Sequence, residues 1–204
     1  MSIPKGGLTV LGGQGYFNHA LTAMPIQNGY AQALYTGDPV RTSANGIKIG
    51  LNTATVVGVF QGCFYLSDTT KLPVYSPYWP ASTSATTGTL EGYTQPHALV
   101  HADPKARMII AANTSVAIAS FGGLARVTLA GTGSTTTGRS LAAADTSGTA
   151  VSAANAMFRI IGVPQIPLPV SAGQSPAVTL SDYYNTWGAT PTYLEVTWSN
   201  HLYG

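Results

Sequence analysis

Hydrophobic and polar residues alternate with a period of two near the end of the chain. This is the pattern of a β-strand that buries one face and exposes the other. In TYLEVTWSNHLY (192–203) the apolar face is Leu194, Val196, Trp198 and Leu202, and the polar face is Glu195, Thr197, Ser199 and His201. A half-buried strand is therefore predicted here.

Shorter strand-forming runs recur from Ile47 onward and are separated by turn-forming residues. The runs are alternating, β-branched or aromatic, as strands prefer. Asp103-Pro104, between two of them, predicts a hairpin turn. The predicted strands are 47–51, 55–66, 74–79, 97–102, 107–112, 124–130 and 157–163. Together they predict an all-β fold, either a β-barrel or a β-sandwich, jelly-roll-like in type.

Residues 1–40 show no sustained period and are rich in glycine, asparagine, proline and tyrosine. Closely spaced glycines break helices and strands, so we expect an extended N-terminal arm that is ordered only where something packs against it. Tyr16, Phe17, Tyr30 and Tyr35 support an arm, because aromatic side chains usually need a surface to lie on. The rest is expected to form one domain, 41–204, with long loops at 81–96, 131–150 and 164–180.

Charged residues are scarce: Asp, Glu, Lys and Arg make up 8% of the 204 residues, against roughly a quarter in ordinary soluble proteins. A surface this poor in charge solubilises an isolated monomer badly. The composition therefore favours a component of an assembly over the alternative, a secreted domain rich in serine and threonine. The single cysteine, Cys63, lies in an apolar run, where we expect a buried hydrophobic residue rather than a reactive thiol.

The charge and hydropathy patterns argue against two classes of partner. The formal net charge is +2 and the nine basic residues are scattered, so direct binding to nucleic acid has little support. No apolar run approaches the length of a membrane span, about 18 residues. The first residues also lack the apolar core of a secretory signal. We therefore expect no membrane partner and a soluble protein made in a cytoplasm.

Three patterns match catalytic or ligand-binding motifs in part, and each has a plainer explanation. GSTTTGRS (133–140) has the spacing of a phosphate-binding loop, but Arg139 replaces the lysine and no helix follows. His97 and His101 would lie about 13 Å apart on a strand, too far to share a metal ion. A glycosidase would need two carboxylates, such as Asp182 and Glu195, across one cleft. We expect no cofactor, no metal and no catalysis.

The segment GVFQGCFYLSDTTKLPVYSPYWPA (58–81) concentrates aromatic side chains beside rigid turns. Its prolines favour an edge or a loop over a central strand. Tyr75, Tyr78 and Trp79 could lie in a core, form a platform for a sugar, or anchor a protein interface. Partial burial in the core is the expected fate of Trp79.

GVFQGCFY (58–65), followed by SPYWPAS (76–82), resembles a pattern in small structural proteins of tailed-bacteriophage heads. FRIIG (158–162) and the terminal VTWSNHLY (196–203) are similar to the closing strands of that family. The resemblance extends roughly from Ile47 to Tyr203. Members often carry an acidic stretch after the YWPA segment, whereas here Glu91 is the only acid between 89 and 101.

The resemblance implies a capsid decoration (cement) protein on the outer surface of the virion, synthesised in the host cytoplasm. Such a protein binds the major capsid protein and stabilises the shell by bridging neighbouring capsid subunits, without catalysis. A homo-oligomer is implied, and a trimer is expected because these proteins commonly cap three-fold junctions. The alternative is a head-fibre domain that binds host glycans, with Trp79 or Trp187 exposed over a cleft. The candidate contacts with the capsid or another subunit are Tyr16, Phe17, Tyr30, Tyr35, Tyr75, Tyr78 and Trp79.

Overall fold

The computed structural model is built of antiparallel strands, which confirms the predicted all-β class. Within the described residues the only helical segment is the single turn η1 (Ile118–Ser120). None of the described segments forms a helix long and apolar enough to cross a membrane. The structure describes residues 6–13, 21–27, 30–50, 55–67, 70–81, 85–86, 96–146, 151, 156–164, 185–189, 191–199 and 201–202.

One sheet has six strands in the order β1-β11-β15-β14-β12-β13. These are β1 (Thr9–Gly13), β11 (Ala106–Ala111), β15 (Tyr193–Trp198), β14 (Phe158–Gly162), β12 (Leu124–Thr128) and β13 (Ala143–Asp145). Just after β11, Ala112 bridges Ala144 of β13, and the Asn113 N–H donates to the Ala144 carbonyl at 2.9 Å. The sheet therefore curls until β11 and β13 meet at one point, without closing into a barrel.

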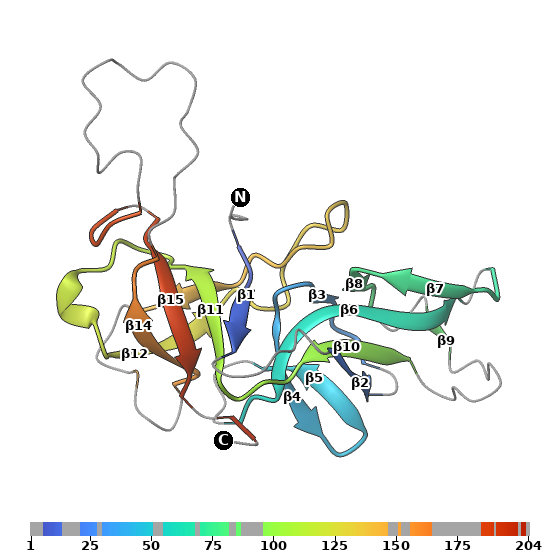
Figure 1. Ribbon diagram of the computed structural model, residues 1–204. Helices are drawn as coiled ribbons and strands as arrows, with labels where there is room; N and C mark the ends of the chain where they lie inside the picture. The colour runs from blue at the N-terminus through green and yellow to red at the C-terminus, as the bar shows by residue number, and fades with distance from the viewer. Residues whose placement is uncertain are drawn as a thin grey trace, which may run out of the picture.

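The second large sheet follows the order β2-β10-β6-β4-β5, with two more strands paired to β6. Its strands are β2 (Leu21–Pro25), β10 (His97–His101), β6 (Gly58–Ser67), β4 (Pro39–Ser43), β5 (Gly46–Ile49), β7 (Pro73–Ser76) and β9 (Ala85–Thr86). The pair β3 (Leu34–Tyr35) and β8 (Tyr78–Trp79) is separate. The ends of this sheet also approach each other, because Ile26 bridges Ile47. In Figure 1 the two large sheets lie beside each other, and β6 and β7 extend to the right.

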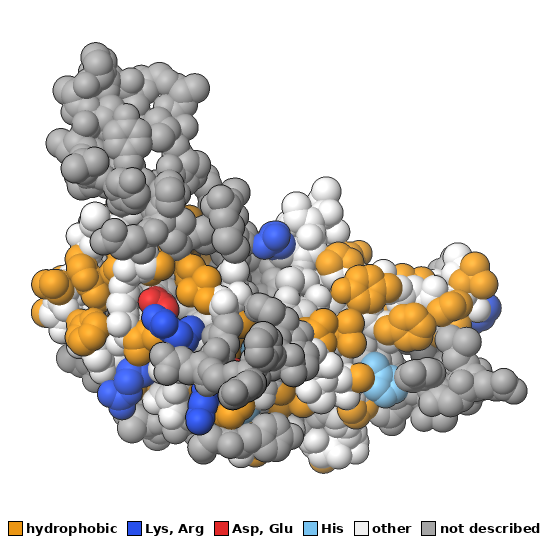
Figure 2. Space-filling view, in the orientation of Figure 1, with side chains coloured by type: hydrophobic (Ala, Val, Ile, Leu, Met, Phe, Trp, Pro, Cys, Tyr) orange, Lys and Arg blue, Asp and Glu red, His pale blue; other side chains and the backbone are white. Residues whose placement is uncertain are grey.

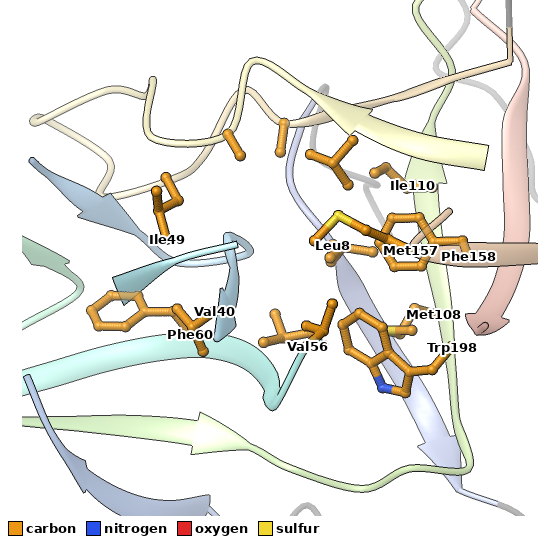
Figure 3. Close-up of a cluster of buried hydrophobic side chains, with 14 of the residues drawn as sticks. Leu8, Val40, Ile49, Val56, Phe60, Met108, Ile110, Met157, Phe158 and Trp198 are labelled. Carbon is orange, nitrogen blue, oxygen red and sulfur yellow. The ribbon is translucent and has the colours of Figure 1, made fainter. Parts of the chain in front are cut away.

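A single large cluster of buried apolar side chains joins the two large sheets, as in a sandwich. It forms because alternate residues of each strand point inward, as Leu194, Val196 and Trp198 do in β15. Phe158 stacks on Trp198 with ring centroids 5.3 Å apart. Figure 3 shows side chains of both sheets meeting in this cluster, among them Val40, Phe60, Met108 and Phe158.

The Asp103-Pro104 turn does not form the predicted hairpin. β10 pairs with β2 and β6, whereas β11 pairs with β1 and β15, so the turn carries the chain from one sheet to the other. The Lys105 N–H donates to the Asp103 carboxylate at 2.8 Å, and the Trp198 Nε1–H donates to the Asp103 carbonyl at 3.2 Å. The sequence located two strands and a turn correctly, but a turn signal does not say whether its flanking strands pair.

The C-terminal alternation holds through Trp198 and then reverses. His201 is buried and Leu202 is exposed, the opposite of the predicted faces. β15 ends at Trp198, and His201 forms a bridge with Val56, whose carbonyl accepts the Leu202 N–H at 2.9 Å. A period of two predicts faces only as far as the strand continues.

Residues 1–40 take part in the body of the protein wherever the structure describes them. β1 pairs along β11, and β2 pairs along β10. Leu8, Ile26 and Leu34 are buried in the main core. The edges of β11 and β10 offer N–H and C=O groups to a further strand, so these residues pair with their own chain instead of forming an arm over a neighbour. β4 also begins at Pro39 and crosses the predicted boundary.

Two of the three predicted loops fall largely outside the described residues. Of 164–180 only Pro164 is described, and of 81–96 only 81, 85–86 and 96. The third, 131–150, contains β13, which pairs with β12 through three cross-strand residue pairs. Ala143–Asp145 within it therefore form a strand that completes the curl of the six-stranded sheet.

Asp38 is a fully buried carboxylate that ties distant segments together. Its oxygens accept hydrogen bonds from the Ser140 hydroxyl and from the N–H groups of Tyr35 and Gly131, the last two at 2.8 and 3.2 Å. Burial raises the pKa of Asp38 to about 6, against the opposing effect of these hydrogen bonds. The carboxyl group thus links the turn before β4 to the segment between β12 and β13.

Candidate binding surface

The hairpin of β6 and β7 carries two of the four most exposed large apolar side chains in the described part of the chain. β7 pairs with the outer half of β6 through four cross-strand residue pairs. At the turn, the Lys71 N–H donates to the Ser67 carbonyl at 2.9 Å, and Lys71 has a positive φ of 57°. Leu72 and Tyr75, which follow the turn, are 62% and 61% exposed. Figure 2 shows apolar side chains gathered over this end of the molecule.

Gly62 of β6 makes room for the ring of Tyr75. The φ of Gly62 is 144°, a conformation that favours glycine. A Cβ atom at this position would lie 3.0 Å from the Tyr75 hydroxyl oxygen and 3.1 Å from the Ser76 carbonyl oxygen. The glycine therefore supplies both the conformation and the space that set the position of Tyr75.

We expect Gly62→Ala to lower the free energy of unfolding by about 1–3 kcal/mol, since the variant adds backbone strain and a close contact. Gly188→Ala is the matched control, because Gly188 also has a positive φ, 85°, but a Cβ there would meet nothing within 4 Å. Denaturant unfolding measures both. Equal losses in the two variants would show that the contact with Tyr75 contributes nothing.

Trp79 and Tyr30 belong to the core rather than to the surface. Trp79 is 2% exposed, its Nε1–H donates to the Tyr30 carbonyl at 3.1 Å, and its ring meets that of Tyr65 edge to face at 5.5 Å. Tyr30 is buried, and its hydroxyl accepts the Ile49 N–H and donates to Gln32 Oε1, both at 2.9 Å. Both side chains therefore pack in the interior and do not form part of the exposed surface.

Tyr35 and Tyr78 stack on each other across the β3–β8 pair, with ring centroids 5.8 Å apart and planes inclined by 15°. Tyr35 is buried and Tyr78 is half-buried. Of the seven candidate contact residues, Tyr16 and Phe17 lie outside the described residues, and Tyr75 alone among the other five is exposed. Among the described candidates, Tyr75 is therefore the residue exposed enough to anchor a contact, and Tyr78 beside it is only partly exposed.

A second apolar tip, which the sequence reasoning missed, lies around η1. Ile118 and Phe121 are 67% and 63% exposed. The turn is held by backbone hydrogen bonds, including Gly122 N–H to the Ile160 carbonyl at 3.0 Å. The sequence feature that could have indicated this tip is the apolar pair Ile118 and Phe121 in IASFGG (118–123), a short segment that ends in two glycines. In Figure 1 this turn and the β6–β7 hairpin lie at opposite ends of the molecule.

The GSTTTGRS segment does not form a phosphate-binding loop. Gly133 bridges Ser140, and the chain continues into β13 instead of a helix. Nearby, a hollow of about 350 Å³ is lined by residues that include Thr36, Gln61, His101 and Arg139. Among the described residues, no aromatic side chain other than His101 lines it, so the described part of the hollow lacks the stacking platform expected of a sugar site.

The remaining candidate chemical groups are explained by packing and pairing. His97 and His101 lie on strand β10, and no three potential metal ligands come together in the part of the chain that the structure describes. Cys63 is fully buried, as predicted, and burial raises the pKa of its thiol to about 12. Glu195 forms an ion pair with Arg107, while Asp182, its proposed catalytic partner, lies outside the described residues.

The described surface combines a low content of charged residues with two exposed apolar tips. We define the hairpin tip as Leu72 and Tyr75 and the η1 tip as Ile118 and Phe121. No protein-family model, curated protein or solved structure matches this chain.

Proposed function

We propose that this chain is a virion structural protein that decorates a tailed-phage capsid and stabilises it by bridging neighbouring capsid subunits. The observation that carries the proposal is the pair of exposed apolar tips at opposite ends of a charge-poor molecule. One tip alone suits a protein that docks on a single partner. Two tips at opposite ends of the molecule suit a protein that holds two neighbours together.

The chemistry of the tips is that of interface anchors. Burying a Leu, Ile or Phe side chain stabilises a contact by about 1.5–3 kcal/mol, and rigid aromatic residues often dominate binding energy. Tyr75 is held over Gly62, and Phe121 follows a hydrogen-bonded turn, so both rings are partly pre-positioned. Ordering such side chains on binding therefore costs less than ordering free loops.

The strands between the tips provide a stiff connection for bridging. β6 runs from the main core to the hairpin tip, and β12 and β14 run from the same core to η1. A force that separates two bound subunits would load these hydrogen-bonded strands and their shared core. Because many copies act together on a symmetric shell, each copy needs to contribute only a weak contact.

Cosedimentation with expanded capsid shells of the same virus tests the proposal. We expect saturable binding by the wild-type chain, and at least about tenfold weaker binding by Leu72→Ser/Tyr75→Ser and by Ile118→Ser/Phe121→Ser. The matched control is Leu141→Ser, because Leu141 is 51% exposed and belongs to neither tip. Wild-type protein should also raise the temperature at which shells rupture, and single-tip variants should not.

Two outcomes would contradict the proposal: no binding of the wild-type chain to shells, or unchanged binding by both tip variants. A glycan screen then addresses the head-fibre alternative. The head-fibre alternative predicted that Trp79 or Trp187 would be exposed over a cleft. Trp79 is buried and Trp187 packs partly against the core, so neither forms such a platform.

A further inference from the structure

On the outer face of the six-stranded sheet, two arginines flank a threonine in one row across three neighbouring strands. Arg107 of β11 lies opposite Thr197 of β15, and Thr197 lies opposite Arg159 of β14. All three point away from the core, because their neighbours Met108, Val196 and Phe158 are buried inside it. Arg107 and Arg159 are exposed, so the row presents two guanidinium groups on one surface.

A shallow hollow of about 440 Å³ lies on this row. Its described lining consists of Pro104, Lys105, Arg107, Ile161 and Thr197, which include two cations and no carboxylate. Lys105 is exposed at the turn before β11. Figure 2 shows basic side chains gathered around a single acidic one over this sheet.

The basic side chains of this face are only partly neutralised. Arg107 pairs with Glu195, and Arg159 Nη1 donates to the Gly122 carbonyl, which is uncharged, at 3.3 Å. The Asp103 carboxylate accepts the backbone N–H of Lys105 and lies outside the hollow's lining. Among the described residues, Lys105, Arg107 and Arg159 therefore face one paired carboxylate, Glu195, on a protein whose formal net charge is only +2.

We propose that this basic face binds an acidic segment of another protein, through carboxylates that pair with Arg159 and Lys105 and share Arg107 with Glu195. Arginine suits this role because its planar guanidinium can hold a carboxylate through two parallel hydrogen bonds. The Thr197 hydroxyl donates its hydrogen to the Ala106 carbonyl at 3.3 Å, so it has no hydrogen left to donate to a carboxylate in the hollow. The recognition is therefore by the cations.

The spacing of the cations fits an extended acidic segment. Arg107 and Arg159 lie two strands apart, which is about 10 Å. In an extended polyproline II segment, which has three residues per turn and rises about 3.1 Å per residue, side chains three residues apart lie on one face about 9 Å apart. A segment that crosses β11, β15 and β14 with carboxylates at every third position would meet both arginines.

Nucleic acid fits this face less well. Duplex DNA carries one phosphate charge per roughly 1.7 Å, and its binding usually rests on about six to ten phosphate contacts. Three cations with one carboxylate among them match two or three carboxylates much better. The inference goes beyond the capsid proposal and does not depend on it, since any protein could carry the acidic segment.

NMR titration of the full-length chain tests this inference with a decapeptide that has glutamate at every third position and serine elsewhere. We expect amide shifts at Arg107, Arg159 and Thr197 that saturate, and that weaken when NaCl rises from about 50 to about 300 mM. Lys105→Gln/Arg159→Gln should weaken binding at least about tenfold. Lys48→Gln/Arg139→Gln, with the same change in net charge on other surfaces, should change it less than about twofold.

The inference is overturned if the wild-type chain does not bind the glutamate peptide, if both double variants lose affinity equally, or if a glutamine-for-glutamate peptide binds as well. Tighter binding of a short DNA duplex than of the peptide would also overturn it, in favour of a phosphate ligand. Thermal melts check that both double variants fold. The tip variants test capsid bridging separately, so either idea can fail alone.

Discussion

Replacing Trp79 with alanine is expected to lower the free energy of unfolding by about 3–5 kcal/mol, the range measured for large buried aromatic residues. The side chain is fully enclosed, and the variant also loses the Nε1 hydrogen bond to the Tyr30 carbonyl and the edge-to-face contact with Tyr65. Unfolding in denaturant, followed by circular dichroism and tryptophan fluorescence, measures the loss.

Tyr75→Ala is the matched control from the same aromatic segment. Tyr75 is 61% exposed, so its loss should change stability by only about 0.5–1 kcal/mol while weakening binding to capsid shells. The pair of variants separates a packing role from a contact role. If Trp79→Ala stayed as stable as wild type and lost binding to shells instead, the packing role of Trp79 would be contradicted.

The stability of the wild-type chain should fall by about 2 kcal/mol through Asp38 as the pH rises from about 4 to 7. Burial raises the pKa of Asp38 from an ordinary 3.8 to about 6. Between these values the folded chain keeps a proton that the unfolded chain has released. The protonated carboxyl therefore stabilises the fold fully below about pH 3.8, and this stabilisation is lost as the pH rises through 6.

Asp38→Asn isolates this effect, because the amide does not titrate in the same range. The difference in unfolding free energy between wild type and variant should favour wild type at pH 4 and shrink by about 2 kcal/mol by pH 7. The amide also places an N–H group against one of the donors, Tyr35, Gly131 or Ser140, and so costs a hydrogen bond at every pH. Parallel pH profiles of the two proteins would contradict the assignment to Asp38.

Much of the local structure could be read from the sequence. The alternating and β-branched runs lie on strands in the structure, from β5 to β15, and the apolar positions 194, 196 and 198 face the core. Cys63 is buried as its apolar surroundings indicated, and HALVH lies on a strand. These features depend on neighbours within a few residues, so local patterns contain the information.

The binding surface was harder to predict, because exposure depends on what the rest of the chain covers. The sequence singled out the aromatic segment, but not that Trp79 would be enclosed by Tyr30 and Tyr65 while Tyr75 remained outside. The sequence does not distinguish Ile118 and Phe121 from buried apolar residues, because their exposure depends on the position of their turn at one end of the molecule. The basic row also depends on strand order, since Arg107, Thr197 and Arg159 are distant in sequence.

By itself, the sequence determined the all-β class, the positions of most strands and the shortage of charge. Only the tertiary structure decided that Asp103-Pro104 joins two sheets, that β1 and β2 complete the chain's own sheets, and that Asp38 lies in the interior. A period of two shows which face of a strand is apolar. It does not show which strand will pair with its edge or which sheet will cover that face, because those contacts form between residues far apart in the chain.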